Sequence, residues 1–226
     1  MCRTALFTDV QRDGVSVLKV CNENRGGSRV VGVFNTQGSY WCMQRRAFVE
    51  KPEKSVHLRG TVVPKDADCP VGWNYMAHSA KTNRLSKGVA EYDLPTTRTW
   101  DIITFAPILR VGQSSYCAVI GMPNYLNCGG VVEVVTCGKL KNVPGNVPRK
   151  ESGVRSSAQI GKDVLSFQLL PGASGQLVLW STMSPNAVEI NGKRVTKTQQ
   201  KEAGGFRIEV PVDTGAQGAV VEISWS

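Results

Sequence analysis

Two pairs of acidic residues have a spacing that could support acid–base chemistry. Asp9 and Asp13 flank a short stretch next to a glycine, and Glu91 and Asp93 lie two positions apart. Two carboxyl groups that flank a glycosidic bond can act as acid and nucleophile in its hydrolysis. Both pairs also have a structural explanation, because Asp beside Gly is typical of turns and residues two apart share one face of a strand. We expect the structural explanation at both places, with Tyr92 pointing into the core.

Metal and thiol chemistry have weaker support. His57 and His78 are the two histidines, and Cys69 lies between them. Structural zinc normally has four ligands at close, characteristic spacings, which are absent, so we expect no metal and no cofactor. Cys128 precedes Gly129 and could be a reactive thiol, but a cysteine nucleophile needs a base and a lowered pKa. Because no motif points to a partner histidine, we expect an inert thiol.

Aromatic side chains offer a different kind of chemistry, because sugars can stack their C–H faces on exposed rings. Trp100 and Trp180 lie in alternating apolar runs, and we expect both in the core. The other aromatic candidates lie near glycine or turn residues and could form a sugar-stacking surface. They are Tyr40, Trp41, Trp73 and Tyr75.

The composition indicates a water-soluble globular protein. Of 226 residues, 41% are hydrophobic and 20% are charged, and no apolar stretch is long enough for a transmembrane helix. The first residues lack the apolar run and cleavage site of a secretory signal. The seven cysteines form an odd set without two-residue spacings, which favours free thiols in a reducing compartment. We therefore expect a cytoplasmic location and no membrane contact.

About half of the net charge of +9 comes from one short segment. Residues 139–162 contain six lysines and arginines against one acidic residue, and the segment lacks periodicity. We interpret it as a long, exposed basic loop that could also mark a subdomain boundary. An acidic partner is conceivable, but nucleic-acid binding is not expected, because interleaved aromatic residues and recognition motifs are missing. We prefer a single domain over residues 1–226.

Short runs with alternating apolar residues separated by Gly, Pro, Asn and Asp predict β-strands. Asn191-Gly192 between two such runs predicts a tight hairpin, and Gly204-Gly205 predicts a looser turn. The expected fold is all-β, an antiparallel β-sandwich of two packed sheets with roughly 12 to 16 short strands. The runs cover residues 16–20, 29–34, 55–63, 88–94, 99–105, 130–136, 164–170, 176–180, 187–190, 206–210 and 219–225.

Four segments carry a family resemblance. They read LFTDVQRDGVSVLKVCNEN at 6–24, VGVFNTQGSYW at 31–41, VAEYDLPTTRTWDIITFAPI at 89–108 and GMPNYLNCGGVVEVV at 121–135. Their order and spacing resemble the C-terminal β-domain of the raffinose synthase, seed imbibition protein and alkaline α-galactosidase family. Thr36 stands where that family usually has Cys. Motif positions for which we expect a structural role are Asp9, Asp13, Gly14, Asn35, Gln37, Gly38, Glu91 and Tyr92.

The resemblance implies a role without catalysis by this chain. In the family this region follows a (β/α)₈ barrel that carries the catalytic aspartates, and the resemblance implies that the present sequence corresponds to the part after that barrel. We therefore expect an accessory domain of a galactosyl-transferring or hydrolysing protein, packed against such a barrel in cis or in trans. Two alternatives remain open: a stand-alone module that binds galactosyl oligosaccharides, and a basic β-domain that binds an acidic partner.

Overall fold

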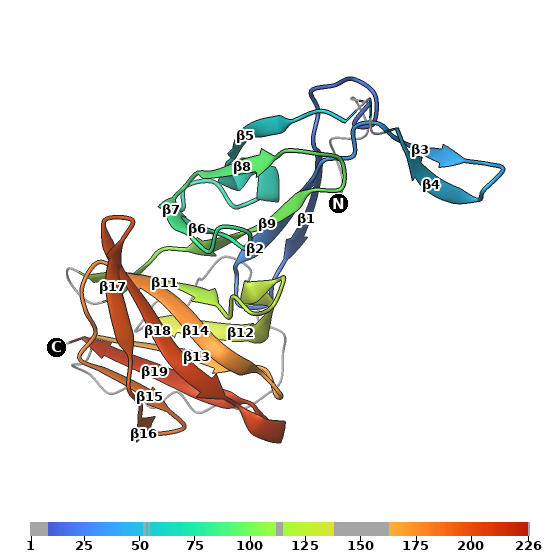
Figure 1. Cartoon of the computed structure of the whole chain (residues 1–226). Helices are drawn as coiled ribbons and strands as arrows, with labels where there is room; N and C mark the ends of the chain where they lie inside the picture. The colour runs from blue at the N-terminus through green and yellow to red at the C-terminus, as the bar shows by residue number, and fades with distance from the viewer. Residues whose placement is uncertain (1–8, 52, 54, 112–114, 138–162, 226) are drawn as a thin grey trace.

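The computed structural model describes residues 9–51, 53, 55–111, 115–137 and 163–225. All strand pairs are antiparallel, and the strands form three five-stranded sheets and two two-stranded ribbons (Figure 1). Within the described ranges, the only helical segments are short 3₁₀ turns, which include η3 (Pro64–Ala67), η4 (Cys128–Val131) and η5 (Gly215–Gln217). The predicted all-β class is confirmed.

The sheets are named here in chain order. The first sheet has the order β1 (Leu18–Glu23), β2 (Arg29–Phe34), β9 (Trp100–Pro107), β6 (Tyr75–Ser79) and β7 (Leu85–Lys87). The second has the order β10 (Leu109–Val111), β11 (Ser115–Gly121), β14 (Ser174–Ser181), β18 (Gly205–Asp213) and β17 (Thr198–Glu202). The third has the order β12 (Val132–Cys137), β13 (Asp163–Leu169), β19 (Ala219–Trp225), β15 (Ala187–Ile190) and β16 (Lys193–Arg194). The ribbons are β3 (Ser39–Cys42) with β4 (Ala47–Glu50), and β5 (Leu58–Val62) with β8 (Ala90–Leu94).

The second and third sheets form the predicted antiparallel sandwich. Leu177 and Ile208 of the second sheet share one buried cluster with Phe167 and Ile223 of the third. Along β14 the neighbouring residues Val178 and Trp180 belong to another cluster, because successive side chains point to opposite faces. The centre of the second sheet is therefore buried on both faces.

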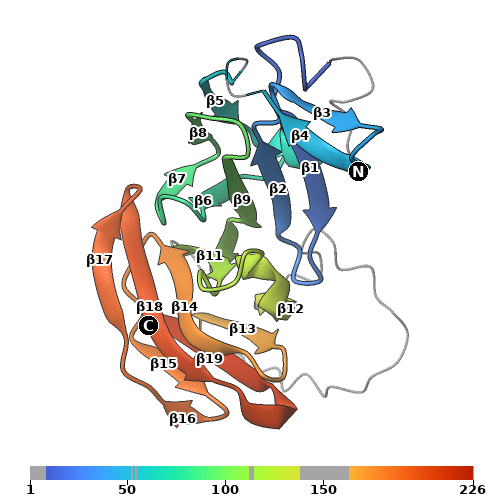
Figure 2. The ribbon, with the colours of Figure 1, turned by 45° about the vertical axis from the view of Figure 1, so that its right-hand side comes forward.

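The first sheet packs on the outer face of the second, and together with the β5–β8 ribbon it adds two layers to the sandwich. Met76 and Ala106 of the first sheet pack with Ile120 and Trp180 of the second. The opposite face of the first sheet packs on the β5–β8 ribbon, for example through Phe105. The order of layers is thus β5–β8 ribbon, first sheet, second sheet and third sheet (Figure 2).

The two predicted turns and the predicted number of strands can be compared with the structure. Asn191 and Gly192 both have positive φ, 50° and 73°, and join β15 to β16 in the predicted hairpin. The second turn lies one residue earlier than predicted, at Ala203 and Gly204, because Gly205 already pairs with Glu202 in the β17–β18 ladder. The described residues contain 19 strands rather than 12 to 16, and the excess includes strands of two or three residues.

Two tryptophans expected in the core have different positions. Trp180 is buried between the first and second sheets, as predicted. Trp100 is 43% exposed at the first position of β9, so its assignment to the core was wrong. The basic segment 139–162 and the subdomain boundary considered there lie outside the described residues. Among the described helical segments, none is long and apolar enough to cross a membrane.

Candidate functional site

The first acidic pair forms a turn. The backbone oxygen of Asp9 accepts hydrogen bonds from the N–H groups of Arg12 and Asp13, both at 3.0 Å. The Asp13 carboxylate accepts from the N–H groups of Val15 and Ser16 at 3.0 and 2.8 Å. The Asp9 carboxylate accepts from the N–H of Gln11 at 3.2 Å, so both carboxylates stabilise local backbone, as Asp does in many turns.

Gln37 fastens this turn to the loop after β2. Its side chain is buried, and its amide nitrogen donates to the carboxylate of Asp13 at 2.7 Å and to the backbone oxygen of Ser16 at 2.8 Å. Its amide oxygen accepts from the N–H of Gly14 at 2.9 Å. Gly14 has a φ of 75°, which favours glycine. Gly38 extends the contact, because its N–H donates to the backbone oxygen of Gln11 at 2.8 Å.

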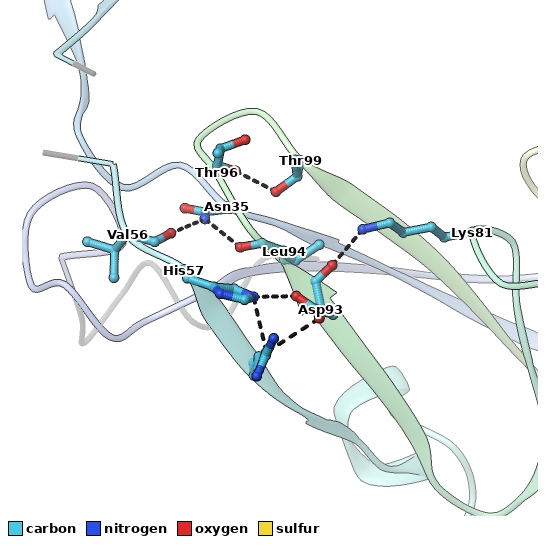
Figure 3. Close-up of polar contacts among 9 residues, drawn as sticks. Asn35, Val56, His57, Lys81, Asp93, Leu94, Thr96 and Thr99 are labelled. Carbon is cyan, nitrogen blue, oxygen red and sulfur yellow. Dashed lines mark hydrogen bonds and ion pairs between the residues drawn. The ribbon is translucent and has the colours of Figure 1, made fainter. Parts of the chain in front are cut away.

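Asn35 joins two further loops. Its buried side-chain nitrogen donates to the backbone oxygens of Val56 and Leu94 at 2.6 and 3.1 Å (Figure 3). Its backbone oxygen accepts from the N–H of Arg98, and its N–H donates to the backbone oxygen of Thr99, at 2.8 and 2.9 Å. Asn35 thus holds the β8–β9 connection in place.

The second acidic pair lies on the exposed face of β8. Glu91 and Asp93 are exposed, while Tyr92 is half-buried and packs against the core between the first sheet and the β5–β8 ribbon, as predicted. Asp93 contacts His57, and Arg59 lies 3.4 Å from the same carboxylate (Figure 3). The hydrogen bond with His57 lowers the pKa of Asp93. A lowered pKa favours the charged form and is unsuited to a general acid at neutral pH.

The residues considered for zinc do not come together. His57 is on the surface beside Asp93, His78 is buried in β6 beside Asn83, and Cys69 is buried in the core of the first sheet. In the part of the chain that the structure describes, no three His, Cys, Asp or Glu residues are grouped to hold a metal ion.

Cys128 does have a histidine neighbour, which sequence reasoning missed. Its sulfur lies 3.7 Å from Nδ1 of His78 and 3.2 Å from the hydroxyl of Thr104. Burial raises the pKa of Cys128 to about 11 and lowers the pKa of His78. The environment therefore favours the neutral form of both groups, the opposite of an activated thiolate pair. The two residues are 50 positions apart, and no local sequence signal connects them.

The four aromatic candidates are scattered. Trp41 is 49% exposed and packs edge-to-face on Phe48, with ring centroids 5.2 Å apart. Tyr40 is half-buried, with the Lys51 ammonium 5.2 Å from its ring centroid. Trp73 is partly buried against two core clusters.

Tyr75 does not belong to a sugar-facing surface. Its side chain is buried in β6, where the first sheet packs on the β5–β8 ribbon. The prediction of an exposed ring at this position was wrong, because β6 is covered on both faces.

A cleft lies elsewhere, beside the tryptophan that was expected in the core. It has a volume of about 360 Å³ and lies between the start of β9 and the loop that precedes η4. One wall carries the indole of Trp100, and the other carries Tyr125 and the 65% exposed Leu126. Lys81, Arg98 and Asn124 add polar groups to the lining. Sequence alternation placed Trp100 in the core, so this cleft was not predicted.

Fold and site together define an all-β domain whose motif residues mainly connect loops. The family described as "Raffinose synthase or seed imbibition protein Sip1" matches residues 1–210. The chain belongs to this raffinose synthase family.

Curated relatives include enzymes of the same family. The chain is 32% identical over 143 residues to a "Probable galactinol–sucrose galactosyltransferase 6" of Arabidopsis thaliana, a match that covers 58% of the chain and 19% of that protein. It is 25% identical over 201 residues to the "Galactinol–sucrose galactosyltransferase" of Oryza sativa subsp. japonica, covering 84% of the chain and 23% of that protein. A stachyose synthase of Pisum sativum is 26% identical over 147 residues, covering 58% of the chain and 17% of that protein. The chain therefore spans about a fifth of the length of the curated relatives that it matches.

Proposed function

We propose that this chain is a non-catalytic accessory domain of a galactosyl-transferring protein, which packs against a (β/α)₈ barrel in cis or in trans. The short share of each relative that the chain covers supports this role. The family-type residues support it as well. Gln37 and Asn35 are buried, and their side chains donate hydrogen bonds to backbone oxygens of neighbouring loops. These bonds stabilise the fold.

The single observation that carries the docking role is the β3–β4 hairpin. Among the described residues its strands pair only with each other, and the hairpin projects from the body of the domain (Figure 1). Trp41, Met43 and Phe48 are 49%, 78% and 59% exposed on it. An isolated two-stranded hairpin is at best marginally stable in water, and grouped exposed apolar side chains are typical of interaction sites. The curated relatives are about five times longer than the segment that matches this chain. We expect the remaining part of such a protein to cover the exposed side chains of the hairpin.

The chemistry of the acidic residues supports the absence of catalysis by this chain. Retaining glycoside hydrolysis needs two carboxyl groups about 5–5.5 Å apart on either side of the scissile bond. Asp13 is occupied by backbone amides and Gln37, and Asp93 by His57 and Arg59. The purified chain should not release nitrophenol from p-nitrophenyl α-galactoside above the buffer rate. Turnover that follows the purified chain through chromatography would overturn the proposal.

Docking can be tested with the rice relative. That protein, produced without the segment matched by this chain, should co-elute with the added chain in size-exclusion chromatography. The double variant Trp41→Ser/Phe48→Ser should lose co-elution. Tyr116→Ser is the matched control, because Tyr116 is an aromatic residue that is 42% exposed on β11. Equal binding by the hairpin variant and the control would refute docking through the hairpin.

A further inference from the structure

The Trp100 cleft has exposed apolar side chains on its two walls and polar groups in its lining. Trp100 presents 43% of its surface, and Leu126 on the opposite wall presents 65%. Its volume of about 360 Å³ lies at the lower end of the range of small-molecule sites. An exposed indole opposite an exposed leucine suits a ligand that has an apolar face.

The wall that carries Trp100 is held rigidly by buried polar residues. Asn35 exchanges two backbone hydrogen bonds with the β8–β9 connection, one from the N–H of Arg98 and one to the oxygen of Thr99. Asp101, directly after Trp100, is buried, and its carboxylate accepts from the N–H of Lys81 at 3.0 Å. The backbone positions of Lys81 and Arg98 are therefore set by the Asp101 carboxylate and by the Asn35 backbone, as a preformed site requires.

The opposite wall is held just as firmly. The N–H of Met122 donates to the oxygen of Cys128 at 2.9 Å and closes the loop. The side-chain amides of Asn24 and Asn127 exchange two hydrogen bonds, of 2.9 and 2.7 Å, which tie the loop to the β1–β2 turn. Both walls are thus built by segments that carry the family resemblance.

In the part of the chain that the structure describes, the hydrogen-bonding groups of the cleft that have no partner include both a donor and an acceptor. The indole N–H of Trp100 has no acceptor among the described residues, and Oδ1 of Asn124 has no donor there, since only its Nδ2 is used, toward Ser174. The charges are partly compensated, because Arg98 pairs with Glu50 and the Lys81 ammonium donates to the backbone oxygen of Asp93. A hydroxyl group satisfies donors and acceptors together, whereas an anion satisfies donors alone.

We propose that the Trp100 cleft is a binding site for a neutral saccharide, with the C–H face of one sugar ring stacked on the indole of Trp100. Sugar hydroxyl groups hydrogen-bond to the Trp100 N–H, the Asn124 oxygen and the Arg98 guanidinium. Leu126 closes over the other side of the ring. This site goes beyond the accessory role proposed above and does not depend on it, because the exposed Trp41, Met43 and Phe48 of the hairpin do not line the cleft.

The probes are sucrose and galactinol, the sugars named in the relatives' activities. Isothermal titration and tryptophan fluorescence of the isolated chain should show saturable binding of at least one of them, with a Kd on the order of millimolar for a small open site. Trp100→Ala should weaken binding at least about tenfold, the loss of one stacking contact. Trp41→Ala, which removes a tryptophan of similar exposure from the hairpin, should leave the Kd unchanged.

Further controls separate the possible outcomes. Leu126→Glu places a carboxylate beside Lys81 and Arg98 and should block the cleft. This variant tests the site even if Trp100→Ala does not fold correctly. Inorganic phosphate should not compete with sugar. The proposal is overturned if neither sugar gives a saturable signal, if Trp100→Ala and Leu126→Glu both bind like the native chain, or if phosphate displaces the sugar. Docking of the hairpin is measured in a different assay and is unaffected by any of these results.

Discussion

The amide nitrogen of Gln37 donates a hydrogen bond of 2.7 Å to the carboxylate of Asp13, across 24 positions of the chain. This contact connects two segments of the family resemblance, and neither residue lines the Trp100 cleft. Gln37 is 1% exposed, so water cannot replace the partners of its three side-chain hydrogen bonds. The family-motif residues Asp13 and Gln37 therefore stabilise the fold.

Replacing Gln37 by Leu should lower the free energy of unfolding by about 2–3 kcal/mol. The change leaves the N–H of Gly14 and the oxygen of Ser16 without their partner, and a buried polar group that loses its hydrogen bond costs about 1–3 kcal/mol. Urea denaturation followed by tryptophan fluorescence measures the loss. Gln200→Leu, on an exposed position of β17, should stay within about 0.5 kcal/mol of the native chain. Similar losses in the two variants would contradict the role of Gln37.

Asp13 should make stability depend on pH in the acid range. Hydrogen bonds from Ser16, first from its side chain and then from its backbone, lower the pKa of Asp13 from 3.8 to about 2. A carboxyl group whose pKa is lower in the folded chain stabilises the fold above its unfolded pKa, and this contribution is lost as pH falls. The urea midpoint should therefore drop between about pH 4 and pH 2, and Asp13→Asn should show a smaller drop in this window. Parallel pH profiles of the two proteins would argue against the assignment.

Runs of apolar residues predicted several strands with their observed bounds, and alternation within a run marks a strand with one covered and one open face. The runs at 29–34, 187–190 and 219–225 have the observed bounds of β2, β15 and β19. In β19, for example, buried and exposed residues alternate almost regularly, because its outer face is in water. In such strands the alternation of apolar and polar residues is visible in the sequence.

Two strands of the inner layers, β6 and β11, were not predicted, since both of their faces are buried. All five residues of β6, Tyr75–Ser79, are buried, and six of the seven in β11 are as well. A continuous run of this kind has no period of two and includes small and polar residues. The same lack of information explains Trp100, because alternation shows which face a residue takes but not where the neighbouring sheet stops covering it.

The candidate sites depended on contacts that are distant in sequence. The turn role of Asp9 and Asp13 follows from neighbouring residues, and the structure has it. The Trp100 cleft requires β9 and the loop before η4 to meet, and no pattern within either segment encodes that meeting. The partner histidine of Cys128 was missed for the same reason.

Arg207 should be essential for the contact between the first and second sheets. Its guanidinium is buried, lies 2.8 Å from the Glu209 carboxylate and donates to the side-chain oxygen of Asn83 at 2.8 Å. Removing one partner of a buried ion pair costs about 3–5 kcal/mol, because the other charge stays buried and unpaired. Since Glu209 is partly exposed, Arg207→Met should fall at the lower end, about 3 kcal/mol, in urea denaturation.

The control for Arg207 is Arg12→Met, at an exposed position of the Asp9–Asp13 turn. It should change stability by less than about 0.5 kcal/mol. Combining Arg207→Met with Glu209→Leu should restore part of the loss, because one of the two carboxylates that Arg207 contacts, Glu209 and Glu202, is removed as well. A double variant as unstable as the sum of the two single variants would show that the ion pair does not couple these residues.

Cys128 should resist alkylation in the folded chain despite its histidine neighbour. The thiolate is the reactive species, and burial raises the pKa of Cys128 to about 11, so almost none is present at pH 8. Iodoacetamide at pH 8, followed by peptide mass spectrometry, should label the half-buried Cys21 and Cys42 well before Cys128. In urea all three should react at similar rates, which controls for the peptide chemistry. Rapid labelling of Cys128 in the native chain, abolished by His78→Phe, would instead mean that His78 takes the thiol proton and that the pair is chemically active.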